Sequence, residues 1–196
     1  MGLGLPTGGD SGAFVPYCKW NSKAGRFYKK TDDGDKEVKN LTAIFDLHGI
    51  KTGNFKFMAG QAPVSNFDSS VGACDAEGGE GFKRGFYVLL YAEKALDGLR
   101  EFSSNAGACN DGMNDLYAAF EAAPECKAGK YPVVKLVDGE AIESQHGTNF
   151  KPVFEIVKWV DDPGVFNSNK SGNGSASQSE SPESSASPSD DDDEEF

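Results

Sequence analysis

The chain has 196 residues, enough for one domain of ordinary size, and a net charge of -12. Hydrophobic residues make up 38% of it, and no apolar run approaches the ~20 residues that a membrane-spanning helix needs. Residues 1–6 have neither the basic nor the apolar segment of a secretory signal, so we expect a cytoplasmic protein. Its four cysteines and two histidines lack the spacing of a metal site, so we expect reduced thiols and no metal.

The first predicted element is a β-hairpin. Two runs rich in β-formers, residues 14–20 and 26–30, flank a five-residue loop with a glycine at its end. The acidic turn at residues 32–35 then leads to a third predicted strand at 37–46.

The remaining elements are also mostly strands. One amphipathic helix is predicted from Ser104 to Ala123, where Pro124 ends it, and residues 59–81 read as a long loop. Further strands are expected at residues 50–58, 82–92, 130–137 and 150–160. The fold class we expect is mainly β: an OB-fold-like five-stranded barrel with an inserted helix and extra strands, followed by a disordered acidic tail.

Composition divides the chain into three parts. Residues 1–166 can bury a core, whereas 167–189 form a flexible linker rich in Ser, Gly and Asn. From residue 167 onward there are eight acids and one lysine, so the domain keeps five of the twelve net negative charges. The chain ends in an acidic tip made of Asp190, Asp191, Asp192, Asp193, Glu194, Glu195 and Phe196.

Cations alternate with aromatic residues at several places in this acidic domain. The longest such segment, residues 17–30, contains five cations and no acid. Aromatic rings stack on exposed bases and cations contact phosphates, so this pattern favours single-stranded nucleic acid. The candidate stacking residues are Tyr17, Trp20, Phe27, Tyr28, Phe86 and Phe150. The candidate phosphate contacts are Lys19, Lys23, Arg26, Lys29, Lys30, Lys51, Lys83, Arg84 and Lys151. Core packing is the competing interpretation for each aromatic residue, and we expect Phe154 and Trp159 in the core.

The sequence resembles the single-stranded-DNA-binding proteins of bacteria and bacteriophages. The resemblance lies in a domain followed by a flexible linker and an acidic tip that ends in Phe196. The domain is similar to a phage-type branch of that group at residues 23–28, 146–154 and 155–160. Bacterial members usually have a proline before the terminal phenylalanine, where this chain has Glu195.

The resemblance implies an OB-fold that binds and protects single-stranded DNA without sequence specificity during DNA replication, recombination or repair. It implies no cofactor and no catalysis, and recruitment of replication proteins (DNA polymerase, helicase/primase or recombination factors) by the tip. If phage-encoded, the protein would work in the bacterial cytoplasm, as a monomer or homodimer. Because the tip and DNA carry the same charge, we also expect the tip to compete with DNA for the domain.

Three other classes remain open at this point. A metal-dependent nuclease is conceivable, but the sequence has none of the common catalytic motifs. An acidic DNA mimic or chaperone-like interaction protein would agree with the negative charge of the domain. A duplex or RNA binder would need a basic recognition helix or an RRM-type signature, which the sequence lacks.

Overall fold

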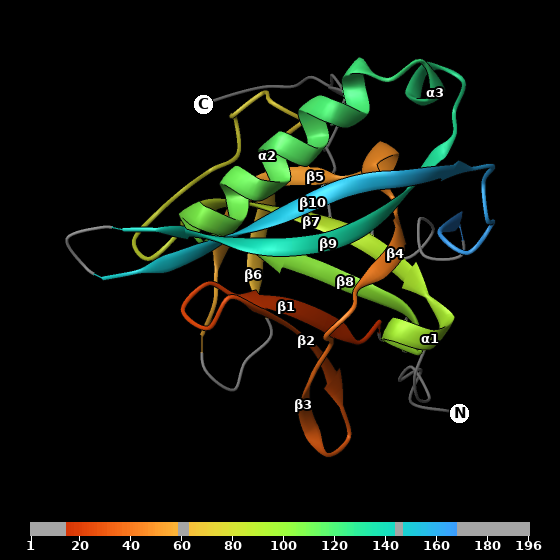
Figure 1. Ribbon diagram of the computed structural model, residues 1–196. Helices are drawn as coiled ribbons and strands as arrows, with labels where there is room; N and C mark the ends of the chain where they lie inside the picture. Colours follow the sequence, from red (N-terminus) through yellow and green to blue (C-terminus); the bar gives the residue numbers. More distant parts are fainter. Residues whose placement is uncertain (1–14, 59–62, 144–146, 168–196) are drawn as a thin grey trace, which may run out of the picture.

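The computed structural model describes residues 15–58, 63–143 and 147–167 (Figure 1). This part of the chain is mainly β. Its strands are β1 (Tyr17–Asn21), β2 (Arg26–Thr31), β3 (Gly34–Glu37), β4 (Thr42–Phe45), β5 (Lys51–Lys56), β6 (Val64–Phe67), β7 (Lys83–Ala92), β8 (Gly98–Ser104), β9 (Tyr131–Ile142) and β10 (Asn149–Val160). Its helices are the short η1 (Leu47–Gly49), α1 (Glu93–Leu96), α2 (Gly107–Ala122) and α3 (Pro124–Lys127).

The strands form one sheet that curls into an open half-barrel. The order along it is β10-β9-β4-β7-β8-β1-β2-β3, with β5 paired to β7 and β6 paired to β5. Most neighbours are antiparallel, but β1 runs parallel to β8. The centre of the sheet is therefore the antiparallel meander of β5, β7 and β8. The N-terminal hairpin of β1 and β2 extends the sheet beyond β8, because β1 pairs with β8.

Curling brings the β1–β2 turn against the beginning of β10. The Trp20 indole Nε1 donates to the carbonyl oxygen of Phe150 at 2.8 Å, and the Phe150 amide donates to the carbonyl of Ser22 at 2.7 Å. Gly25, at φ 64°, lies so close to the Phe150 ring that an added Cβ would be 2.9 Å from it. These contacts join the two ends of the sheet without extending the strand ladder.

Helix α2 lies along β10 and covers one face of the sheet (Figure 1). Its buried side chains, Cys109, Met113, Leu116 and Phe120, recur at helical spacing and pack into the core. Gly112 is also buried, and a Cβ there would lie 2.3 Å from the carbonyl oxygen of Pro152. A glycine at this point lets the helix approach the strand closely.

The structure confirms the predicted hairpin, the main helix and the strand at the C-terminal end of the domain. Other expectations were wrong in detail. The predicted third strand at 37–46 is shortened to β4, while β3 begins within the predicted acidic turn at 32–35, and the predicted long loop contains β6. Strand β8 and the short α1 before it were not predicted at all. The structure confirms a mainly β fold with a curled, open sheet, which is less specific than the predicted OB-fold barrel.

Two further expectations can be compared with the described residues. None of their helices has the length and apolar character to cross a membrane. All four cysteines lie in the described ranges and none is paired in a disulfide; Cys18 and Cys109 are buried, Cys126 is half-buried and Cys74 is exposed. The linker beyond residue 167 and the tip at 190–196 lie outside the described residues.

Candidate nucleic-acid interface

Strand alternation divides the sheet into two faces with different chemistry. One face, which we call the core face, carries Cys18, Trp20, Phe27, Phe86 and Phe102, all buried. Because residues directly opposite in an antiparallel ladder point to the same side, the register assigns the intervening residues to the other face. We call that side the aromatic face. Its residues include Lys51, Phe55, Phe67, Lys83, Tyr87, Glu101, Tyr17, Lys19, Arg26, Tyr28 and Lys30, with Phe57 directly after β5. Leu89, Tyr91 and Leu99 lie on the same side and belong to a second hydrophobic cluster with Tyr131 and Phe166.

Four rings on the aromatic face form a continuous row. The ring centroids of Phe57 and Phe55 are 6.3 Å apart and the rings are nearly parallel, at 11°. Phe55 meets the edge of Phe67 at 5.7 Å, and Phe67 meets Tyr87 at 6.1 Å. Phe57 is 45% exposed, Phe67 and Tyr87 are half-buried, and Phe55 is buried beneath them. The row therefore offers aromatic surface to solvent on a rigid base.

A glycine makes room for this row. Phe55 lies over Gly85 of the neighbouring strand, where a Cβ would come within 3.0 Å of the Phe55 ring. Asn105 stabilises β5 at Phe55, because its Nδ2 donates a hydrogen bond to the Phe55 carbonyl oxygen at 3.0 Å. The lowest ring is thereby fixed in place before any ligand arrives.

Lysines border the row of rings. Lys51 Nζ lies 5.0 Å from the centroid of Phe67, and exposed Lys83 is directly opposite Phe55 in the ladder. Within the described ranges, neither lysine lies within ion-pair distance of a carboxylate. These two cations keep their charge available to a phosphate backbone.

Two tyrosines extend the aromatic face beyond the row. Half-buried Tyr17 lies on β1 and half-buried Tyr28 on β2, on the same side as Tyr87. Burial raises the pKa of Tyr87 to about 12, and the charges of Glu101 and Asp46 act in the same direction. Its phenol is therefore neutral at physiological pH and does not repel phosphate.

Three of the predicted stacking residues lie on the core face. Phe27, Phe86 and Trp20 are 1%, 3% and 7% exposed and pack in the main hydrophobic cluster. Stacking on a base would require each of them to leave the core, so we remove them from the interface. Of the other predicted stacking residues, Tyr17 and Tyr28 lie on the aromatic face, while Phe150 is half-buried beneath Gly25. Trp159 and Phe154, expected in the core, pack half-buried against it.

Five of the nine predicted phosphate-binding cations are engaged by carboxylates. On the hairpin, Lys19 pairs with Asp35 and Arg26 pairs with Glu37. Lys29 is 6% exposed on the core face and pairs with Asp97 at 2.7 Å. The other two engaged cations and their partners are Arg84 with Asp68, and Lys151 with both Asp115 and Glu140.

The remaining predicted cations lie apart from one another. Lys51 and Lys83 border the ring row, Lys30 is half-buried on β2, and Lys23 lies at the exposed β1–β2 turn. The predicted cluster at residues 17–30 is thus not a continuous positive surface. None of the four rings of the row, Phe55, Phe57, Phe67 and Tyr87, was selected from the sequence. The signal that could have found them is two-residue alternation around Lys51 and Lys83.

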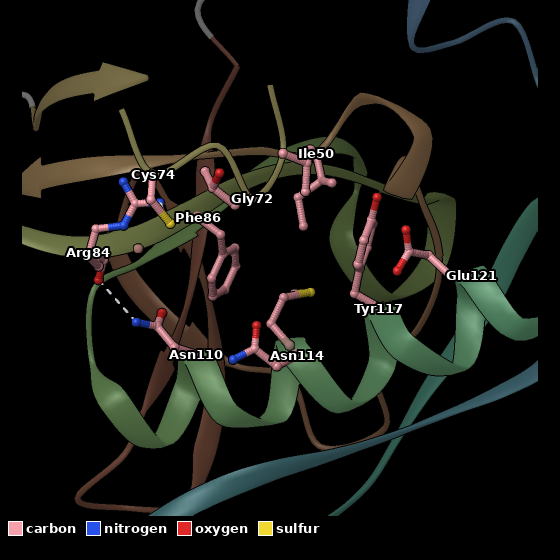
Figure 2. Close-up of a pocket in the computed structure, with 13 residues that line it drawn as sticks. Ile50, Gly72, Cys74, Arg84, Phe86, Asn110, Asn114, Tyr117 and Glu121 are labelled. Carbon is pink, nitrogen blue, oxygen red and sulfur yellow. Dashed lines mark hydrogen bonds between the residues drawn. The ribbon is translucent and has the colours of Figure 1, made fainter. Parts of the chain in front are cut away.

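A cavity of about 520 Å³ lies on the opposite side of β5 and β7, between these strands, α2 and residues 71–74 (Figure 2). Phe86 and Met113 supply its apolar lining, and Asn110 donates through Nδ2 to the carbonyl of Arg84 at 3.0 Å. The guanidinium of Arg84 is held by both carboxylate oxygens of Asp68, at 2.8 and 2.6 Å. The one arginine of this cavity is thus engaged, which makes it a poor site for a polyanion.

Within the described ranges, no cluster of three or more His, Cys, Asp or Glu side chains is arranged to hold a metal ion. No protein-family model, curated protein or solved structure matches this chain.

Proposed function

We propose that this protein binds single-stranded DNA along the aromatic face. The binding does not depend on the overall DNA sequence, and it involves no cofactor and no catalytic step. The observation that carries the proposal is the continuous row of Phe57, Phe55, Phe67 and Tyr87 beside Lys51 and Lys83. Exposed aromatic rings next to unpaired cations are the two features that binding of single strands requires.

Each feature contributes in its own way. Base stacking on an aromatic side chain contributes about 1–3 kcal/mol per base and tolerates any base, because every base has a flat face. Lysines contact phosphates and release counterions, which makes the affinity depend on salt. Neutral phenols such as that of Tyr87 add stacking surface without adding negative charge.

The topology supports the same proposal. We also infer an OB-fold-like arrangement, supported by the antiparallel meander of β5, β7 and β8, by α2 after it, and by the β9–β10 hairpin whose β9 pairs with β4. OB-folds bind oligonucleotides on the face of their second and third strands and on the adjoining loops. In the proposed correspondence β7 and β8 would take those positions. Of the ring row, Tyr87 lies on β7, Phe67 on β6 and Phe55 on β5, with Phe57 directly after β5.

We further propose that the acidic tip at residues 190–196 recruits replication, recombination or repair proteins. The support is its sequence: six acids steer it toward basic surfaces, and the ring of Phe196 beside them suits an apolar pocket with a basic rim.

Titration with a fluorescently labelled oligothymidylate of 30 nucleotides at several salt concentrations tests the proposal. We expect saturable binding whose logarithmic salt slope is about -0.7 for each phosphate contact. Absence of binding at low salt, by the full chain and by a chain shortened to residue 189, would overturn it.

One observation favours an acidic interaction protein instead. The engagement of Lys19, Arg26, Lys29, Arg84 and Lys151 by carboxylates leaves little free positive charge on the described part of a negatively charged domain. This alternative predicts no affinity for single strands at any salt concentration, so the same titration separates the two functions.

A further inference from the structure

A carboxylate lies in the middle of the aromatic face. Glu101 is on β8, where its ladder partners are Tyr17 on β1 and Leu89 on β7. Tyr87 is the diagonal neighbour of Glu101 on β7, a distance that long side chains span. Glu101 therefore has a tyrosine on each of the two adjoining strands.

This carboxylate has no partner within the described part of the chain. Glu101 is half-buried, yet no lysine or arginine lies within ion-pair distance, and no hydrogen bond reaches its side chain there. Burial raises its pKa above the ordinary value for a glutamate. On the same face, Lys19 binds Asp35, and neither Lys51 nor Lys83 forms an ion pair with Glu101. A half-buried carboxylate in this position retains acceptor capacity for a ligand.

The chemistry of a carboxylate selects one part of a nucleic acid. It repels phosphate, and it can accept hydrogen bonds from base edges but cannot donate them. Guanine presents two adjacent donors, N1–H and N2–H₂, which match the two carboxylate oxygens. Adenine and cytosine each present one amino group beside a ring acceptor, and thymine presents one N–H between two carbonyls. In a single strand these edges are open to side chains.

We propose that Glu101, with Tyr17 and Tyr87 beside it, forms a guanine-binding subsite on the aromatic face. The two tyrosines supply surfaces on which a base can stack, and Glu101 supplies the acceptors for its edge. The inference rests on the proposed binding of single-stranded DNA and adds to it a preference for one base at one position.

The test compares two oligonucleotides that differ in one chemical group. One has 15 alternating dT-dG repeats, and the other has hypoxanthine in place of guanine, which keeps N1–H but lacks the N2 amino group. We expect the wild-type chain to bind the guanine oligonucleotide at least about tenfold more tightly, the effect of one hydrogen bond to a charged group. Glu101→Gln should bring this ratio close to one, because the amide offers only one acceptor.

A second acid on the same face provides the control. Asp35→Asn removes an equal charge, but it removes it from the carboxylate that binds Lys19. We expect this variant to keep the guanine preference, and Glu101→Asp to keep part of it. Thermal unfolding of each variant checks that the fold is intact.

The possible results separate this inference from the proposed function. Equal affinities of the wild-type chain for the two oligonucleotides, with oligothymidylate still bound, would overturn the guanine subsite and leave the proposed function in place. A preference that survives in Glu101→Gln would also overturn the subsite, because another group would then read the base. Failure of the wild-type chain to bind any oligonucleotide would overturn both proposals.

Discussion

Lys51 of β5 lies over the ring of Phe67 of β6, with 5.0 Å between Nζ and the ring centroid. A second pair of the same kind occurs on the same strand, where Lys56 lies 5.9 Å from the centroid of Phe82. Residues 51 and 56 differ by an odd number, so the two pairs lie on opposite sides of the strand. The proposed function needs the first pair and not the second.

Replacing the first pair should weaken DNA binding. In Lys51→Ala/Phe67→Ala we expect the affinity for a labelled 30-nucleotide oligothymidylate to fall tenfold or more, because one stacking surface and one phosphate contact are lost. The logarithmic salt slope should become less steep by about 0.7. Fluorescence anisotropy at four or more salt concentrations measures both quantities.

The second pair is the matched control for this prediction. Lys56→Ala/Phe82→Ala removes the same atoms from the other side of β5, and we expect affinity within about twofold of wild type. Equal losses in the two double variants would show that the aromatic face is not the binding surface.

Trp20 should affect stability and not binding. Its indole N–H bonds the Phe150 carbonyl at 2.8 Å, and its ring is buried in the core. In Trp20→Phe we expect the free energy of unfolding to fall by roughly 1–3 kcal/mol, since a hydrogen bond and core volume are lost. Urea unfolding measures this loss. Oligothymidylate affinity should stay within twofold; a large loss of affinity in a variant of unchanged stability would return Trp20 to the interface.

Asp68 should stabilise the loop beside the cavity in a pH-dependent way. Hydrogen bonds from Arg84, Thr52 and the Ala76 amide hold the pKa of its carboxyl well below the usual range. A lowered native pKa means that this stabilisation is complete above the unfolded-state pKa of about 3.9 and is lost as pH falls from there toward the native pKa. At pH 7 we expect Asp68→Asn to lower the free energy of unfolding by about 1–2 kcal/mol, near the lower end for charged hydrogen bonds because Arg84 is partly exposed.

The pH profile distinguishes this prediction from simple loss of packing. The difference between wild type and Asp68→Asn should shrink as pH is lowered below about 4. The control is Glu37→Gln, which removes the half-buried partner of the exposed Arg26 and should cost less than about 1 kcal/mol at pH 7. A difference that is constant from pH 7 to pH 3 would contradict the assigned pKa.

Removal of the acidic tip should tighten DNA binding at low salt. Deleting residues 190–196 removes six carboxylate side chains that carry the same charge as DNA. We expect affinity for oligothymidylate to rise severalfold at 0.05 M salt, and the gain to shrink as the Debye length falls toward 3 Å near 1 M. Phe196→Ala, which keeps the side-chain charge, should leave affinity unchanged. An unchanged affinity after deletion at low salt would contradict competition between the tip and DNA.

The positions of the strands were largely predictable, because β-branched and aromatic runs separated by glycine turns mark them. Strand β8 was missed because Gly98–Ser104 lacks apolar alternation: the positions that face the core are Gly98, Arg100, Phe102 and Ser104, and the buried Arg100 stands where an apolar residue would be expected. Arg100 is tolerated in the core because it donates to the carbonyls of Leu96 and Lys30 and lies 3.6 Å from Asp97. Leu96 and Asp97 are close to Arg100 in sequence, but Lys30 comes from β2, and the local sequence does not indicate that contact.

The sequence predicted what kind of surface the site would be, a combination of cations and aromatic rings, but it predicted fewer of the residues that form it. The sequence places cations and aromatic residues together at residues 17–30, yet alternation sends Trp20, Phe27 and Lys29 to the core face. The acids that engage Lys19 and Arg26 follow on β3, which pairs with β2. Their effect depends on strand register, which composition alone does not give. Applying two-residue alternation to each strand would have separated the two faces.

The most direct measurement is photocross-linking of the full chain to an oligothymidylate that carries 5-iododeoxyuridine, with the linked residues identified by mass spectrometry. If the aromatic face binds single strands, cross-links should form at Phe57, Phe67, Tyr87 and Tyr17, and free oligothymidylate should compete them away. Cross-links confined to α2, to the cavity beside Arg84 or to the β9–β10 hairpin would contradict the proposed interface.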